Sequence, residues 1–227
     1  MDIRKNDFIN IDYVGKTEGK IFDLTDEELA KKENIYDEKR EYGPVTIVVG
    51  AGHLIKGIDE SLIGKKVGEE FETNIEPEKA FGKKNPKLLK IIPEKIFKNQ
   101  EVKPHPGMTI NVDNAVGYVI SVSAGRVIVD FNHPLAGKEL NYKIKVNKKI
   151  EDKKEQIQSL MDLFIGAKNI DVELKDKKAE IKYNSEKEII PQLKDLIEKE
   201  IKKYVDVEEV EIKKASNDEN KDNKDNG

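Results

Sequence analysis

Residues 44–71 read PVTIVVGAGHLIKGIDESLIGKKVGEEF, and this stretch decides the fold. Between Val45 and Val49, every second side chain is a branched apolar one, which is typical of a strand with one buried face. Gly50 and Gly52 then interrupt the strand, because glycine favours turns over extended structure. Beyond the turn, apolar side chains recur at helical spacing at Leu54, Ile55, Ile58 and Leu62. The stretch therefore predicts a strand, a glycine turn and a short helix beginning near residue 53.

The same strand, turn and helix order occurs in nucleotide-binding proteins, but neither of their phosphate motifs is present. The dinucleotide fingerprint G-x-G-x-x-G needs a third glycine where Ile55 stands. The phosphate loop needs a lysine and a hydroxyl residue directly after Gly57, where Ile58 and Asp59 follow. The apolar face of the helix is thus either ordinary core or the floor of an apolar pocket.

The stretch resembles the central segment of the FK506-binding-protein (FKBP) family of peptidyl-prolyl isomerases. That family has the pattern G-x-G-x-[LV]-I-x-G-x-[ED]-x-x-L-x-G-x-x-x-G-[ED] after a strand. Its fixed positions are occupied here by Gly50, Gly52, Leu54, Ile55, Gly57, Asp59, Leu62, Gly64, Gly68 and Glu69. The resemblance implies an α+β fold, in which an antiparallel half-barrel sheet surrounds a short helix.

Two further segments resemble the pocket motifs of this family. Residues 13–15 (YVG) and 22–23 (FD) match its opening aromatic-x-G and F-D, and residues 77–82 (PEKAFG) match its P-x-x-A-[YF]-G turn. The resemblance implies an apolar pocket built from Tyr13, Phe22, Asp23, Val45, Leu54, Ile55, Ile58, Phe81, His133, Leu135 and Tyr142. Without the family, Phe22 reads as core and Asp23 as a turn cap.

A long insertion separates residues 77–82 from the segment NHPLAG at residues 132–137. It resembles the SlyD-like branch of the family, in which an insert-in-flap domain with chaperone activity replaces a short flap. We expect the insert to span residues 84–131, so that the isomerase domain is discontinuous, with parts at residues 1–83 and 132–151.

The insert sequence favours a helical turn at residues 93–97, a strand at 107–112 and a hairpin about Ala124-Gly125. Exposed strand edges beside apolar side chains can capture extended polypeptide by backbone hydrogen bonding. Candidates for client contact or for core are Leu88, Leu89, Ile91, Ile92, Ile96 and Phe97. The alternative is an insert with a purely structural role.

Residues 152–215 predict a separate module with the order α-β-β-α-β. A unit of this size is small for independent stability, so we expect it to form a homodimer that buries more apolar surface. Residues 216–227 lack apolar side chains and are expected to be disordered. Residues 24–43 predict a solvated surface helix with Thr25 as its N-cap.

Composition excludes several classes of function. The net charge is −4 with acidic and basic residues interspersed, which argues against binding to nucleic acid or to an anionic membrane. The chain has no cysteine, and its three histidines are dispersed, so we expect neither thiolate chemistry, a metal site nor a cofactor. No apolar run has the length of a signal peptide or a membrane span, which predicts a cytoplasmic protein.

The expected activity is the cis-trans isomerisation of Xaa-Pro bonds in folding polypeptides, with chaperone activity from the insert. Two positions depart from the family. Phe81 lacks the hydroxyl that the family usually places there, and Ile58 stands where tryptophan is common. A holdase chaperone that keeps the fold without catalysis is therefore the alternative.

Overall fold

The computed structural model divides into two compact units, the first of which combines segments distant in sequence. The first unit joins residues 1–73 to residues 141–227, and the second holds residues 74–140. The residues described are 2–112, 115–167, 170–184 and 188–215. The disorder expected for residues 216–227 falls outside them.

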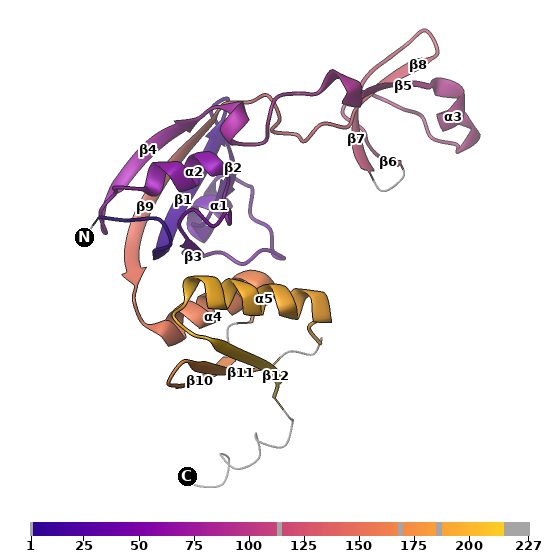
Figure 1. Ribbon diagram of the computed structural model, residues 1–227. Helices are drawn as coiled ribbons and strands as arrows, with labels where there is room; N and C mark the ends of the chain where they lie inside the picture. The colour runs from indigo at the N-terminus through magenta and orange to yellow at the C-terminus, as the bar shows by residue number, and fades with distance from the viewer. Residues whose placement is uncertain (1, 113–114, 168–169, 185–187, 216–227) are drawn as a thin grey trace, which may run out of the picture. The chain divides into compact units, whose positions relative to one another are not determined.

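A five-stranded sheet forms the centre of the first unit (Figure 1). Its strands follow the order β2-β1-β9-β4, and β3 also pairs with β1. The elements around it are β1 (Phe8–Thr17), β2 (Lys20–Leu24), α1 (Glu27–Lys32), β3 (Val45–Val48), α2 (Lys56–Leu62), β4 (Glu70–Ile75) and β9 (Leu140–Ile150). Because β1 pairs antiparallel with β2, β3 and β9, it places residues from all three beside its own. This antiparallel α+β fold confirms the predicted class.

The glycine turn is longer than the sequence predicts, and α2 begins at Lys56 instead of near His53. Gly50 and Gly52 have φ values of 76° and 80°, which the helix cannot accommodate. Ile55 is still extended, with ψ of 145°. Leu54 and Ile55 therefore precede the helix, and of the four predicted apolar residues only Ile58 and Leu62 lie on its buried face.

The helix predicted after β2 is present as α1, but its cap is Asp26 and not Thr25. The Asp26 carboxylate accepts a hydrogen bond from the Leu29 N–H at 2.9 Å. Thr25 is buried instead, where its hydroxyl accepts from the Tyr13 N–H and donates to the Asp12 carboxylate. The prediction that Thr25 is the N-cap was wrong, because the Thr25 hydroxyl hydrogen-bonds to Tyr13 and Asp12 of β1 instead.

The C-terminal module has the predicted α-β-β-α-β order. Its elements are α4 (Lys153–Ile165), β10 (Ile170–Lys175), β11 (Lys178–Tyr183), α5 (Pro191–Tyr204) and β12 (Glu209–Lys214). The strands form a sheet in the order β10-β11-β12, and both helices lie on one face of it (Figure 1). Their buried side chains form one core with Phe8, Val48 and Ile150 of the central sheet. This packing buries apolar surface that the sequence argument assigned to a second copy, so homodimer formation stays a prediction.

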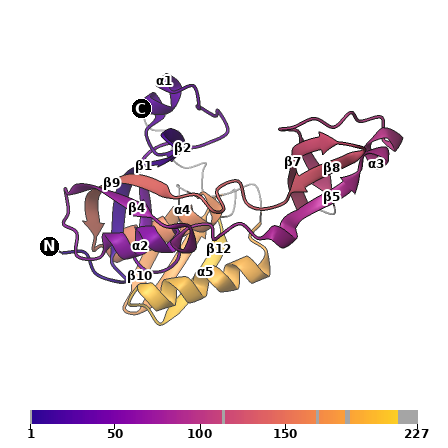
Figure 2. The same ribbon diagram turned by 90° about the horizontal axis from the view of Figure 1, so that it is seen from above.

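The second unit contains a four-stranded antiparallel sheet in the order β5-β8-β7-β6. Figure 2 shows β5, β8 and β7 side by side. Its elements are the 3-10 turns at Pro77–Lys79 and Pro86–Leu88, β5 (Leu89–Pro93), α3 (Glu94–Asn99), β6 (Thr109–Val112), β7 (Ala115–Ser123) and β8 (Arg126–Asp130). The helical turn, the strand and the hairpin predicted here are confirmed, and Ala124 and Gly125 both have positive φ. The sequence missed β5, because its apolar residues do not alternate.

No helix in the described segments combines the length and apolar character needed to span a membrane.

Candidate active site

Three aromatic rings from three strands meet on the inner face of the central sheet. The ring centroid of Tyr142 on β9 lies 5.9 Å from that of Tyr13 on β1 and 5.7 Å from that of Phe22 on β2. Both contacts are edge-to-face, the arrangement that aromatic quadrupoles favour. Gly15 pairs with Tyr142 and Asp23 across the strands, and its missing side chain leaves room for the rings of Tyr142 and Phe22.

Asp23 connects this aromatic group to a loop distant in sequence. Its carboxylate accepts a hydrogen bond from the Tyr13 hydroxyl at 3.1 Å and one from the Arg40 guanidinium at 2.5 Å. The same guanidinium donates to the Leu24 carbonyl at 2.7 Å. Sequence analysis missed Arg40, which lies between α1 and β3 in a segment assigned to the surface. The sequence offered one signal for it: arginine is rare in this lysine-rich chain, so an arginine at position 40 could have marked a specific contact.

Burial raises the pKa of Tyr13 to about 12, and the neighbouring Asp23 carboxylate adds to the increase. The phenol therefore keeps its proton throughout the physiological pH range and serves as a hydrogen-bond donor. The pKa of Tyr142 is also raised, again mainly by burial. The group thus offers apolar ring surface and fixed donors, with no ionised nucleophile.

Further residues predicted to line the pocket lie in the first unit, in the turn before α2 and beside it. Leu54 and Ile55 are half-buried, as is Val45 on β3. Ile58 is only 2% exposed, so its side chain belongs to the core beneath the turn. In the described part of the chain, the Ile55 N–H has no hydrogen-bond partner, which leaves a donor for a peptide carbonyl.

The remaining predicted pocket residues lie in the second unit and form a group of their own. The rings of Phe81 and His133 stack in parallel, with centroids 4.1 Å apart. His133 Nδ1 accepts a hydrogen bond from the Leu135 N–H at 3.1 Å, which fixes the orientation of the imidazole. The sequence assigns these three residues to the pocket of Tyr13, and that assignment stays a prediction.

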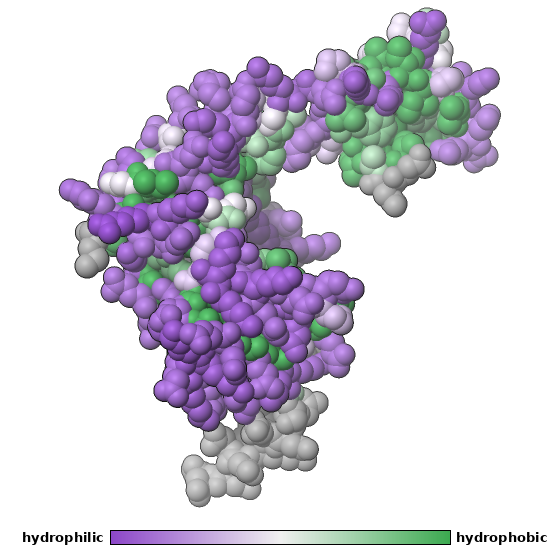
Figure 3. Space-filling view, in the orientation of Figure 1, coloured by the Kyte–Doolittle hydropathy of each residue, from purple (hydrophilic) through white to green (hydrophobic). Residues whose placement is uncertain are grey.

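The structure separates the candidates for client contact in the insert from those in its core. Phe97 is 7% exposed and packs with Val119, Val127 and Val129, so it is a core residue and not a contact surface. The exposed large apolar side chains of the insert are Leu88, Leu89, Ile91, Ile96, Val112, Val116 and Ile120. Figure 3 shows hydrophobic surface gathered over this part of the molecule.

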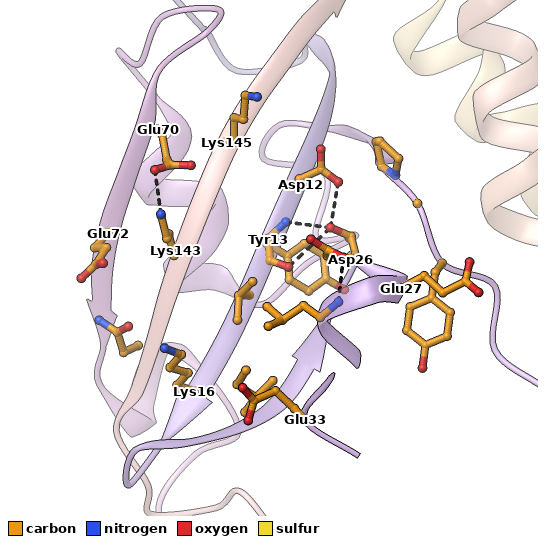
Figure 4. Close-up of a pocket in the computed structure, with 18 residues that line it drawn as sticks. Asp12, Tyr13, Lys16, Asp26, Glu27, Glu33, Glu70, Glu72, Lys143 and Lys145 are labelled. Carbon is orange, nitrogen blue, oxygen red and sulfur yellow. Dashed lines mark hydrogen bonds and ion pairs between the residues drawn. The ribbon is translucent and has the colours of Figure 1, made fainter. Parts of the chain in front are cut away.

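A hollow of about 730 Å³ lies on the outer face of the central sheet (Figure 4). Its walls include Asp12, Lys143 and Lys145, which alternate along the strands with the inward-facing residues Tyr13 and Tyr142. Lys143 and Glu70 form an ion pair at 2.7 Å in this hollow. Tyr13 also lines the hollow, so the hollow borders the aromatic group at this residue, while Lys143 and Lys145 lie on the opposite face of β9 from Tyr142.

Within the described segments, no three His, Cys, Asp or Glu side chains converge as a metal site requires.

Two family models match the chain. The model of the FKBP-type peptidyl-prolyl cis-trans isomerases matches residues 1–103, and a model described as FKBP26, IF domain matches residues 90–135. These matches overlap at the start of the insert, where β5 begins the second sheet.

Relatives of known name support the same family. A short-type peptidyl-prolyl cis-trans isomerase of Methanocaldococcus jannaschii is 42% identical over 63% of this chain and 92% of its own length. A probable FKBP-type 16 kDa isomerase of Pseudomonas fluorescens is 35% identical over 48% of this chain and 75% of its own. The isomerase SlyD of Pasteurella multocida is 29% identical over 64% of this chain and 68% of its own. The chain therefore belongs to the family of FKBP-type peptidyl-prolyl cis-trans isomerases, on its SlyD-like branch.

Proposed function

We propose that this isomerase acts on Xaa-Pro bonds in unfolded or partly folded polypeptides, which its insert captures. The observation that carries the proposal is the contact between the rings of Tyr13, Phe22 and Tyr142. Asp23 lies beside these rings, and its carboxylate is held by hydrogen bonds from Tyr13 and Arg40. This arrangement supplies an apolar surface for a proline ring and a polar contact beside it.

Such a site suits the chemistry of prolyl isomerisation. The peptide bond resists twisting because of its partial double bond, with a barrier of ~18–20 kcal/mol. The planar form is charge-separated and water stabilises it, so an apolar surface lowers the barrier by withdrawing the amide from water. A donor placed at the twisted amide assists further. No step requires a nucleophile.

The insert supports capture of the client chain. Its sheet has the order β5-β8-β7-β6, so β5 and β6 are edge strands within it. Ile91 on β5 is 63% exposed, and Ile96 on the following helix α3 is 45% exposed. An extended client could add a strand to such an edge and cover these side chains.

The proposal is tested by measuring two substrates with one set of variants. Fully burying an exposed isoleucine contributes about 1.5 kcal/mol or more. Ile91 and Ile96 are 63% and 45% exposed, so a client that covers both gains about 1.5 kcal/mol in total. The double variant Ile91→Ser/Ile96→Ser should therefore bind clients about tenfold more weakly. We expect it to lose acceleration of proline-limited refolding and suppression of aggregation, while isomerisation of a short Xaa-Pro peptide is unchanged. The matched control is Ile190→Ser, which removes from the C-terminal module an isoleucine whose exposure, 61%, is close to that of Ile91.

The pocket is tested with the short peptide alone. Phe22→Ala and Asp23→Ala should each lose acceleration of cis-trans relaxation. If the folded wild-type chain suppresses aggregation without accelerating the short peptide, the protein is a holdase and the catalytic proposal is wrong. If Ile91→Ser/Ile96→Ser refolds clients as fast as the wild type, client capture does not use this surface.

A further inference from the structure

His53 lies where the turn before α2 meets the C-terminal module. Its ring forms an edge-to-face contact with Phe164 of α4, with centroids 6.1 Å apart and planes at 88°. Ala51 in the same turn packs on the core of the module, and α4 also contacts β3. The C-terminal module thus touches the segment that leads directly into Leu54 and Ile55.

This turn is closed by side chains more than by its own backbone. His53 Nδ1 accepts a hydrogen bond from the Val48 N–H at 3.2 Å, which joins the last residue of β3 to the far side of the turn. From α2, the buried Asp59 carboxylate accepts from the Gly50 and Gly52 N–H groups, each at 3.1 Å. The path of the chain into Leu54 therefore depends on the placement of the imidazole.

Histidine is a costly residue for this place. With Nδ1 accepting, the neutral ring carries its proton on Nε2, which is buried and has no hydrogen-bond partner among the described residues. A buried polar atom left unpaired lowers stability and calls for a compensating role. A purely apolar side chain would pack against Phe164 without this penalty but could not bind the Val48 N–H.

We propose that Phe164 and His53 are positioning residues for the isomerase, through which the C-terminal module holds Leu54 and Ile55 in the orientation that binds substrate. The proposal rests on the isomerase function proposed above and extends it to the module. Phe164 packs against the imidazole, and the imidazole binds the Val48 N–H at the start of the turn. If either contact is removed, the turn relaxes, and Leu54 and Ile55 change position with it.

The same geometry makes the turn sensitive to acid. Burial lowers the pKa of His53, Glu200 of α5 and Asp59 of α2 oppose the decrease, and Lys203 of α5 adds to it. The face that α4 presents to the ring is the apolar Phe164. Protonation would place an N–H on Nδ1 against the Val48 N–H and break their hydrogen bond. Neutral imidazole is therefore the form that holds the turn, and its effect is lost as the pH falls through the lowered pKa.

The first test compares Phe164→Ala with Leu163→Ala, which removes a neighbouring, exposed side chain of the same helix. We expect Phe164→Ala to lower kcat/KM for a short Xaa-Pro peptide by about two- to thirtyfold, the range for residues coupled to a distant site. Leu163→Ala should leave it unchanged. Far- and near-ultraviolet circular dichroism would establish that both variants are folded at the assay temperature. A folded Phe164→Ala with wild-type kcat/KM would overturn the proposal.

The second test uses the pH profile and a conservative rescue. His53→Asn keeps an acceptor near the position of Nδ1, whereas His53→Ala removes it, so Asn should retain more activity than Ala at neutral pH. Wild-type kcat/KM should fall as the pH decreases below the ordinary histidine pKa of about 6.5. The Asn variant should lack this fall, although His105 and His133 remain in both proteins. A wild-type to Asn ratio that is constant with pH would contradict the proposed role.

A third readout separates this inference from the isomerase function itself. The amide chemical shifts of Leu54 and Ile55 report their positions whether or not the chain catalyses. They should move in Phe164→Ala and during titration of His53, and stay in place in Leu163→Ala. An inactive wild type that shows these shifts would reject the isomerase function and keep the mechanical link. If the wild type is active but the amide shifts of Leu54 and Ile55 respond neither to Phe164→Ala nor to the titration of His53, only the proposed role of the C-terminal module is rejected.

Discussion

The substitution Gly15→Ala tests the aromatic group most sharply, because Gly15 lies against two of its rings. A Cβ atom added at Gly15 would lie 2.8 Å from Cε1 of Tyr142 and 2.9 Å from Cζ of Phe22. Carbon atoms in contact prefer about 3.5 Å or more, so each ring must retreat by about 0.6 to 0.7 Å. The φ of Gly15 is not positive, so alanine fits the backbone and the rings alone absorb the change.

The expected cost follows from these displacements. Overpacking a well-packed group costs about 1–3 kcal/mol, whereas replacing glycine by alanine stiffens the unfolded chain and returns about 0.4–1 kcal/mol. We expect a net loss of about 1–2 kcal/mol in the free energy of unfolding. The effect on catalysis is larger, because a displacement of about 1 Å in an active site can lower the rate up to about a hundredfold. A fall in kcat/KM of about tenfold or more is expected.

The matched control is Gly117→Ala in the second unit. There the added Cβ would lie 2.6 Å from Cγ1 of Val129 and 2.7 Å from Cε1 of Phe131, so the overpacking is similar. Short-peptide isomerisation and urea unfolding are measured for both variants. Gly117→Ala should destabilise the insert and weaken aggregation suppression, with short-peptide kcat/KM unchanged. If Gly15→Ala keeps wild-type kcat/KM while its stability falls, the rings of Phe22 and Tyr142 do not form the catalytic surface.

Two further predictions concern the polar partners of these rings. In Tyr13→Phe, the urea midpoint should become less sensitive to alkali. The folded pKa of Tyr13, about 12, exceeds the ordinary value of 10. The stability that Tyr13 contributes is therefore fully present below pH 10 and is lost as the pH rises through 12; parallel curves for the two proteins would contradict this. Arg40→Ala should lower short-peptide kcat/KM about two- to fivefold, since its ion pair with Asp23 is only partly buried. Arg40→Lys should restore little, because lysine cannot reproduce the planar contact to Asp23 and the Leu24 carbonyl; full recovery would show that charge alone suffices.

Much of the fold was predictable because its signals are local. Alternation identified the strands around Val45 and Leu140, helical spacing identified α4 and α5, and Ala124-Gly125 marked a hairpin. Boundaries were less predictable, since the positive φ of Gly50 and Gly52 moves the start of α2 to Lys56. Spacing alone cannot distinguish the last residues of a turn from the first turn of a helix, because both can present apolar residues three apart.

The candidate site divides in the same way. Tyr13, Phe22 and Asp23 stand in motifs, so the resemblance located them before the structure brought them together. Arg40 has no motif, and its contact with Asp23 depends on the path of the segment between α1 and β3. Contacts between segments distant in sequence carry no periodic signal. Phe97 shows a different limit, because its residue type fits both core and contact surface, and only its burial separates the two.

The C-terminal module is the part of the chain on which the family is least informative. Both family models end before it, at residues 103 and 135. Its core is continuous with Phe8, Val48 and Ile150, so neither part can be removed without exposing apolar side chains of the other. A module that served only to bind a second copy would not need this shared core, nor a histidine with a buried, unpaired Nε2 at its boundary. Both features follow if the module fixes the turn that carries Leu54 and Ile55, because a fixed turn requires a rigid support packed directly against it.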